Sequence, residues 1–92
     1  MKIRIYSKPD CPWCVKAKEL MKNLHLNYEE FVLNVDYTKD ELRQLVYEHK
    51  PVSASMTPPL TVPQIFVNMK LIGGYEDFAE YCEATGIMGL QN

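Results

Sequence analysis

Two cysteines separated by two residues are the part of the sequence best suited to chemistry, in the segment Cys11-Pro12-Trp13-Cys14. A thiolate attacks a disulfide, and a second thiol nearby can displace the first product and close an internal disulfide. Cys11 falls at the start of a predicted helix, where free N–H groups and the helix dipole stabilise a thiolate. Cys14 shares that helix's apolar face. The pattern therefore predicts Cys11 as the nucleophile and Cys14 as the resolving thiol.

A pair of this kind can also be half of a zinc site. The chain has 3 cysteines, and the third, Cys82, falls at a core position of a later predicted helix. No second C-x-x-C or H-x-x-x-H pattern follows, and His25 and His49 lie far apart at predicted helix ends. We therefore expect no metal. We expect Cys82 to be a packed core thiol, with modification or regulatory pairing as the alternative.

The composition narrows the class of protein. With 92 residues and a net charge of −2, the chain supports one core, and we predict a single domain over residues 1–92. The weakly acidic balance argues against a nucleic-acid partner. An odd number of cysteines argues against a disulfide-stapled secreted domain. No apolar run suits a signal peptide or a membrane span, so we predict a cytoplasmic protein with no membrane partner.

The elements that must position the cysteines follow from the hydrophobic pattern. Alternation predicts a strand over residues 2–6, and a 3.6-residue period predicts a helix over Pro12–Leu24. The capping box Thr38–Glu41 starts a second helix that ends by Pro51, and Gly73-Gly74 precedes a third that ends near Gly86. Further strands are predicted over Tyr28–Val35, Val62–Val67 and Leu71–Ile72, the last two joined by a turn at Asn68-Met69-Lys70.

The predicted order of elements is β-α-β-α-β-β-α. A crossover helix joins the first two strands, so we expect them to be parallel, whereas the tight turn makes the last two antiparallel. The sequence therefore predicts an α/β fold with a mixed four-stranded sheet and helices on both faces.

The chain resembles a glutaredoxin, a dithiol (C-P-x-C) member of the thioredoxin-fold superfamily. The resemblance is carried by Tyr6–Cys14, Thr61–Val67, Ile72–Phe78 and the order of elements. It implies a thioredoxin-like fold and a glutathione-dependent thiol–disulfide oxidoreductase that reduces protein disulfides and glutathionylated proteins. Glutathione would be reductant and substrate, the family suggests ribonucleotide reductase as a protein partner, and we expect a monomer.

The resemblance also implies how glutathione binds. Pro63 would form a cis peptide bond facing the cysteines, and Val62 would present its backbone to the cysteinyl unit. Lys8 would pair with the glycine carboxylate, and the start of the last helix would hold the γ-glutamyl group. The implied glutathione-binding residues are Lys8, Trp13, Thr61, Val62, Pro63, Gly74, Glu76 and Asp77.

Three features depart from the family pattern. Trp13 stands where relatives usually carry Tyr or Phe, and Glu76 adds a negative charge beside the γ-glutamyl site. The loop over residues 50–60, before the predicted strand that contains Pro63, is longer than in typical relatives. We interpret this loop as a surface insertion, with a role in selecting partners as the alternative.

Proteins with three other functions can share this fold. A glutathione-independent, thioredoxin-like reductant would keep both cysteines, but Lys8 and the Thr61–Pro63 segment speak against it. An iron–sulfur cluster carrier would bind a cluster through Cys11 and glutathione, but Pro12 and Cys14 count against that reading. The intact dithiol also argues against a non-catalytic adaptor.

Overall fold

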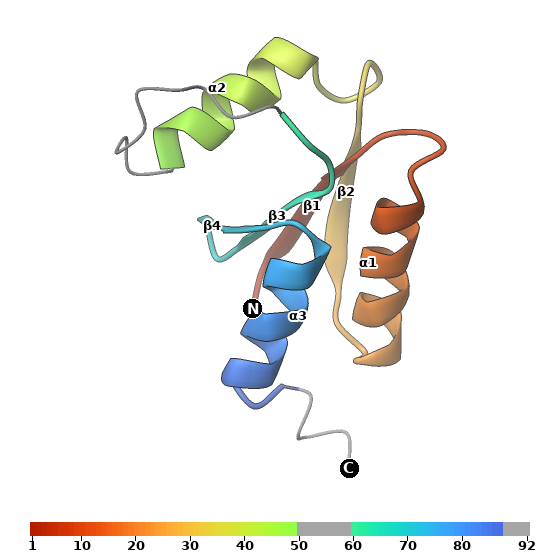
Figure 1. Cartoon of the computed structure of the whole chain (residues 1–92), viewed down its shortest axis with the longest axis vertical. Helices are drawn as coiled ribbons and strands as arrows, with labels where there is room; N and C mark the ends of the chain where they lie inside the picture. Colours follow the sequence, from red (N-terminus) through yellow and green to blue (C-terminus); the bar gives the residue numbers. More distant parts are fainter. Residues whose placement is uncertain (50–59, 88–92) are drawn as a thin grey trace.

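A computed structural model describes residues 1–49 and 60–87, so the predicted loop over residues 50–60 lies outside the described residues except for Leu60. Within this part, strands and helices follow the predicted order (Figure 1). Their bounds are β1 Ile3–Ser7, α1 Pro12–Asn23, β2 Tyr28–Val32, α2 Lys39–His49, β3 Gln64–Val67, β4 Lys70–Gly73 and α3 Tyr75–Ala84.

The sheet topology confirms the predicted strand directions. The strands lie in the order β2-β1-β3-β4; β1 pairs with β2 in parallel, and β3 pairs antiparallel with both β1 and β4. Tyr6 near the end of β1 lies opposite Gln64 at the beginning of β3. The segment that leaves β1 and the segment that enters β3 therefore meet at the same end of these two central strands, which brings the cysteines beside Pro63.

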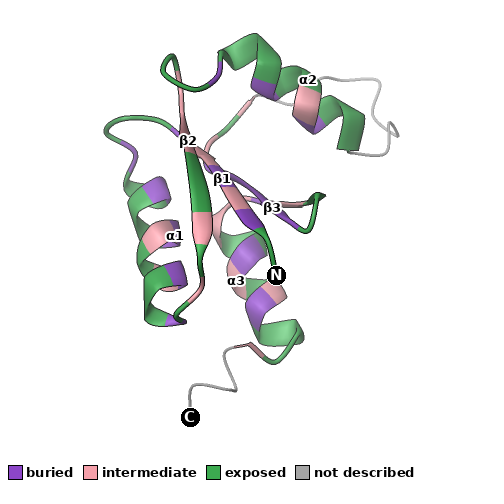
Figure 2. Ribbon diagram, turned by 180° about the vertical axis from the view of Figure 1, so that it is seen from behind, coloured by how far each residue is buried: buried purple, intermediate pink, exposed green. Residues whose placement is uncertain are grey.

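Helices cover both faces of the sheet, as predicted (Figures 1 and 2). On one face, α1 and α3 pack against the apolar side chains of β1 and β3, with Phe78 of α3 fully buried. On the other face, α2 buries Leu42 and Val46 in a smaller cluster that includes Tyr6 and Leu71. Such burial is the main favourable contribution to folding, since it removes apolar surface from water.

The predicted bounds of all four strands were wrong. Strand β1 runs over Ile3–Ser7 rather than residues 2–6, because Ser7 still pairs with Val32 of β2. Strand β2 ends at Val32 because the Asp36 carboxylate accepts a hydrogen bond from the Val32 N–H and Asn34 adopts a φ of 64°, which begins a turn. Strand β3 begins at Gln64, after Pro63, which has no N–H to donate to a ladder. The hairpin turn is formed by two residues with positive φ, Asn68 and Met69, so that Lys70 already belongs to β4.

The predicted helix starts are confirmed, and α1 ends at Asn23, one residue before the predicted end, with Leu24 as its C-cap. The Thr38 N–H donates to the Glu41 carboxylate, and the Glu41 N–H donates to the Thr38 hydroxyl, which forms the capping box that precedes α2. Gly86, with a φ of 79°, follows the end of α3 as predicted. None of the helices over residues 1–49 and 60–87 combines the length and apolar character that crossing a membrane requires.

Candidate active site

The two cysteines of the motif are joined in a disulfide at the start of α1. Cys11 is the N-cap residue with extended backbone (φ −117°, ψ 100°), and its Sγ accepts a hydrogen bond from the Cys14 N–H at 3.1 Å. Pro12 occupies the first helical position, where its missing N–H leaves no bond unmade. In the reduced protein, the same N–H and the helix dipole stabilise a thiolate on Cys11.

The two cysteines are both buried but have different neighbours. Cys14 is 1% exposed and Cys11 6%, so both residues are buried. Cys11 Sγ, however, lies 3.9 Å from the Val62 carbonyl oxygen, at the edge where the Thr61–Pro63 segment passes the motif. In the reduced form, the Cys11 thiol can donate a hydrogen bond to that carbonyl.

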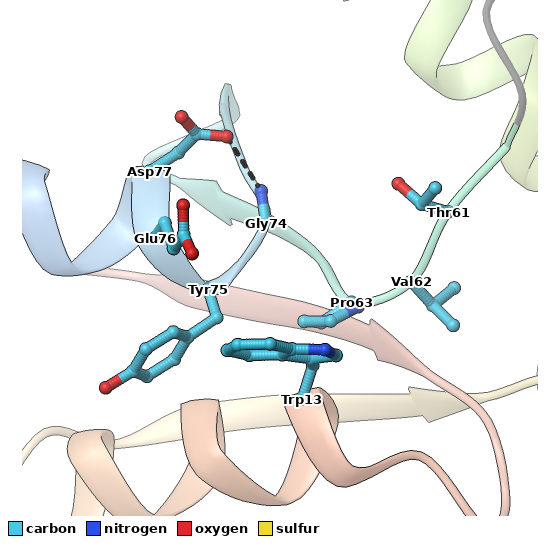
Figure 3. A pocket seen from close by; sticks show the side chains of 8 residues that line it. All are labelled: Trp13, Thr61, Val62, Pro63, Gly74, Tyr75, Glu76 and Asp77. Atoms are coloured by element: carbon cyan, nitrogen blue, oxygen red, sulfur yellow. Dashed lines mark hydrogen bonds between the residues drawn. The ribbon is translucent and has the colours of Figure 1, made fainter.

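A hollow of about 260 Å³ opens beside this edge, and we call it the Trp13 hollow (Figure 3). The start of α3 and the Thr61–Pro63 segment form opposite sides of it. The structure thus brings together all the predicted glutathione-binding residues except Lys8. Its lining residues are Trp13, Thr61, Val62, Pro63, Gly74, Tyr75, Glu76 and Asp77.

The Thr61–Pro63 segment is held by the side chain of Gln64, the first residue of β3. The Val62–Pro63 peptide bond is cis, and the side chain of Gln64 reaches back across it. Gln64 Nε2 donates to the Thr61 carbonyl oxygen at 2.9 Å and lies 3.3 Å from the Thr61 hydroxyl oxygen. Figure 3 shows the Val62 side chain turned away from the Trp13 hollow. The backbone of Val62, rather than its side chain, therefore faces the neighbourhood of Cys11.

The start of α3 is capped by its own acidic side chain. The Asp77 carboxylate accepts a hydrogen bond from the Gly74 N–H at 3.2 Å, shown as a dashed line in Figure 3. Gly73 has a φ of 127°, and a Cβ there would collide with the Asp77 carboxylate, whereas a Cβ on Gly74 would make only an ordinary contact. Of the two glycines, Gly73 is therefore the one whose position excludes a side chain.

Lys8 does not line the Trp13 hollow. It lines an open cavity of about 580 Å³ with both cysteines, and a further hollow with Thr61 and Val62. The acidic side chains Glu76 and Asp77 line the Trp13 hollow instead. Cys11 thus shares a cavity with the exposed Lys8, whereas the acidic start of α3 lines a different hollow.

A family model described as glutaredoxin matches residues 3–72. The chain belongs to the glutaredoxin family. It is 39% identical over 87 residues to glutaredoxin 1 of Escherichia coli, covering 88% of this chain and 92% of that protein. It is 37% identical over 79 residues to hybrid peroxiredoxin hyPrx5 of Haemophilus influenzae, covering 86% of this chain but only 28% of that longer protein.

A solved structure of oxidised Escherichia coli glutaredoxin has the same fold. The match has a TM-score of 0.68 and 35% sequence identity, and it covers 90% of this chain and 94% of that one. The predicted glutaredoxin resemblance and the thioredoxin-like fold are therefore confirmed. Family membership and the Cys11–Cys14 pair together support thiol–disulfide oxidoreductase chemistry at this site.

Sequence reasoning missed one aromatic residue of this glutaredoxin site. Tyr75, the first residue of α3, lines the Trp13 hollow, with its ring centroid 5.8 Å from that of Trp13. Lys16 Nζ lies 4.8 Å from the Trp13 centroid, a cation–π contact. Trp13 is 48% exposed. An aromatic residue directly after Gly-Gly, at a helix start, was the available signal.

The end of β1, which leads into the cysteine motif, is held by two hydrogen bonds to the Ser7 carbonyl oxygen. The Tyr37 hydroxyl donates to the Ser7 carbonyl oxygen at 2.6 Å, and the Leu33 N–H donates to the same oxygen at 3.0 Å. Burial is the main cause that raises the pKa of Tyr37 to about 12, and the nearby Tyr6 adds a smaller contribution. The phenol therefore stays protonated and remains a donor.

A small ionic cluster adjoins the same position. Glu30 Oε2 accepts hydrogen bonds from the Ser7 hydroxyl at 2.7 Å and from Lys18 Nζ at 2.9 Å. Burial by itself raises the pKa of the Glu30 carboxyl, but the bonds from Lys18 and Ser7 outweigh it and hold the pKa below its ordinary value. The cluster ties α1 to β2 beside the motif.

Replacing Glu30 by glutamine is expected to make stability less sensitive to acid. Because the folded pKa of Glu30 is lowered, its contribution to the free energy of unfolding is present above the ordinary pKa and is lost as pH falls through the folded value. The difference in unfolding free energy between the native protein and Glu30→Gln should shrink between about pH 7 and about pH 3 in urea titrations. A difference independent of pH would contradict the role given to the cluster.

The third cysteine lies away from this site. Cys82 of α3 is a free thiol, fully buried in the cluster between the sheet and α1, and burial raises its pKa. The predicted core position of Cys82 is therefore confirmed. In the part of the chain that the structure describes, no three His, Cys, Asp or Glu side chains gather as a metal site would need.

Proposed function

We propose that this glutaredoxin is a glutathione-dependent thiol–disulfide oxidoreductase that reduces protein disulfides and glutathionylated proteins. The observation that carries the proposal is the position of Cys11, with its Sγ 3.9 Å from the Val62 carbonyl oxygen. An extended cysteinyl peptide that hydrogen-bonds to the Val62 backbone would place its own sulfur against Cys11. The two ends of the tripeptide then reach opposite sides of this point.

The charged groups on either side match those of glutathione. The γ-glutamyl end carries a carboxylate and an ammonium, which suit the free N–H groups at the start of α3 and the Asp77 carboxylate. Trp13 supplies an apolar wall for the same end. The glycine end carries a second carboxylate, which suits the exposed Lys8. Glu76 lies beside the γ-glutamyl site, and we expect its negative charge to weaken binding of that carboxylate.

The chemistry is a sequence of thiol–disulfide exchanges. The Cys11 thiolate attacks one sulfur of the substrate disulfide, a mixed disulfide forms, and the departing thiolate takes up a proton. Either the Cys14 thiolate then attacks Cys11 Sγ and closes the internal disulfide seen in the structure, or glutathione attacks the mixed disulfide directly. Two glutathione molecules reduce the internal disulfide and leave as glutathione disulfide. A separate NADPH-dependent reductase regenerates glutathione.

Replacing Cys14 by serine is expected to separate the two reactions. Deglutathionylation needs only Cys11 and glutathione, so its rate should stay within about threefold of the native rate, whereas reduction of intramolecular protein disulfides should fall at least about tenfold. Both rates are measured as NADPH oxidation coupled through glutathione reductase.

Two outcomes would redirect the proposal. Reduction of the native protein by a thioredoxin-type reductase, with no activity from glutathione, would favour the glutathione-independent reductant. A brown anaerobic preparation with visible cluster absorbance that Cys11→Ser removes would favour an iron–sulfur carrier.

We propose ribonucleotide reductase as one protein substrate and the cytoplasm as the compartment, since a reducing glutathione pool operates there. Cys14→Ser holds a substrate on Cys11 because the resolving thiol is gone. Purified ribonucleotide reductase from the same organism should form a mixed disulfide with Cys11 of the Cys14→Ser protein. The native glutaredoxin, supplied with glutathione, should support turnover of ribonucleotide reductase. Absence of both would remove this partner.

A further inference from the structure

A second hollow shares only Thr61 and Val62 with the Trp13 hollow. It has a volume of about 360 Å³, and we call it the Lys39 hollow. The Val62 side chain, turned away from the Trp13 hollow in Figure 3, is one of its lining groups. The two hollows therefore border the same stretch of backbone beside Cys11, one next to the start of α3 and the other next to the start of α2.

The lining of the Lys39 hollow combines apolar surface with positive charge. Leu42 and Tyr37 are buried, while Leu33 and Leu60 are partly buried beside them. Lys8 and Lys39 are exposed, and among the described residues no acidic side chain lines the hollow. Over residues 1–49 and 60–87, the ion pairs that the structure shows involve other basic residues. An apolar hollow of about 300 Å³ or more with a few placed charges has the character of a ligand site.

We propose that the Lys39 hollow binds the residue that follows the reactive cysteine of a peptide or protein substrate. The preferred segment is cysteine, then a leucine-sized apolar residue, then an acidic residue. The proposal rests on the function proposed above, since that function places the substrate backbone along Val62. The γ-glutamyl end carries both an ammonium and a carboxylate, which match the acidic start of α3, so the chain beyond the cysteine is directed toward the lysines.

Glutathione leaves much of this hollow unused. Its glycine has no side chain, so the carboxylate can reach Lys8 while the partly exposed apolar surface of Leu33 and Leu60 stays in water. A leucine in the same place would remove that surface from water, which favours binding in proportion to the area buried. A carboxylate one residue further on would then lie within reach of Lys39, which stands at the start of α2. The hollow thus distinguishes protein substrates from glutathione.

The test uses Cys14→Ser protein prepared as the mixed disulfide of Cys11 with glutathione. A peptide thiol replaces glutathione in the exchange: the bond between Cys11 Sγ and the glutathione sulfur breaks, a bond to the peptide sulfur forms, and the peptide's thiol proton ends on glutathione. No net oxidation occurs, and mass spectrometry gives the equilibrium constant. Three end-blocked peptides are compared, with the sequences Ala-Cys-Leu-Glu, Ala-Cys-Gly-Glu and Ala-Cys-Leu-Gln.

We expect the exchange constant of the Leu-Glu peptide to exceed that of the Gly-Glu peptide by about tenfold, and that of the Leu-Gln peptide by about threefold at low salt. Lys39→Gln should remove the second ratio and keep the first. Leu60→Ala should lower the first ratio and keep the second. Lys22→Gln, an exposed lysine of α1 that lines neither hollow, is the matched charge control and should change neither.

Equal constants for the three peptides would overturn the proposal, and so would ratios that Lys39→Gln and Leu60→Ala leave unchanged. The exchange ratios compare peptides with one another on the trapped protein and need no reductase. A failure of the glutathione-coupled assay would overturn the proposed function without affecting them, and equal peptide constants would leave that assay intact. The two failures are therefore distinguishable.

Discussion

Replacing Cys11 by serine is expected to abolish both reductions, with kcat/KM at least about a thousandfold lower, as for the loss of a nucleophile in other enzymes. A serine hydroxyl does not ionise near neutral pH and cannot form the mixed disulfide. The fold should survive, because serine is a favourable N-cap residue and its oxygen can accept the Cys14 N–H bond that Cys11 Sγ accepts now. The loss is therefore chemical, and it is measured with the glutathione-coupled assay beside urea unfolding.

The matched control for this prediction is the third cysteine. Cys82→Ala removes a buried thiol that contacts neither hollow, so activity per folded molecule should stay within about twofold of the native value even where stability falls. Retained activity in Cys11→Ser, together with its loss in Cys14→Ser, would reverse the roles assigned to the two cysteines of the motif.

Replacing Phe78 by alanine is expected to lower the free energy of unfolding by about 3–5 kcal/mol. Phe78 is 0% exposed and packs within the cluster formed by β1, β3, α1 and α3, so truncation removes buried apolar area and leaves a cavity. Domains of this kind have total stabilities of only about 5–15 kcal/mol, so a large part of the margin is lost. Urea unfolding followed by circular dichroism measures the change.

Val35→Ala is the control for the loss of apolar side-chain atoms. Val35 is 77% exposed, in the turn after β2, and its truncation should change the unfolding free energy by no more than about 0.5 kcal/mol. A cost of less than about 1 kcal/mol for Phe78→Ala would show that α3 is not anchored through this side chain. Because α3 also carries Tyr75 and Asp77, its loosening should weaken glutathione binding as well.

Local patterns in the chain were enough to predict most of the fold. Helical periodicity with Pro12 at the first position placed α1 correctly, and the Thr38–Glu41 capping box marked the start of α2. The errors fell where short-range signals compete. Val35 continues an apolar run and favours a strand, yet Asn34 and Asp36 form a turn through their own side-chain and backbone preferences. Such contests are decided by hydrogen bonds that hydrophobic pattern alone does not reveal.

Some features of the candidate site also follow from local sequence, whereas others depend on the tertiary structure. The dithiol and its place at the start of a helix follow from residues close together in the chain, and the sequence by itself determined them. Glu30 and Tyr75 line cavities together with residues of the motif, and Lys39 lines a hollow with Thr61 and Val62; none of the three was predicted there. The family resemblance had already placed Lys8 and Asp77 at opposite ends of glutathione, but only the tertiary structure showed that they line two separate hollows that share Thr61 and Val62. The physical reason is that strand pairing joins β1 to β3 across more than half the chain, and side-chain direction at that junction depends on register rather than on local composition.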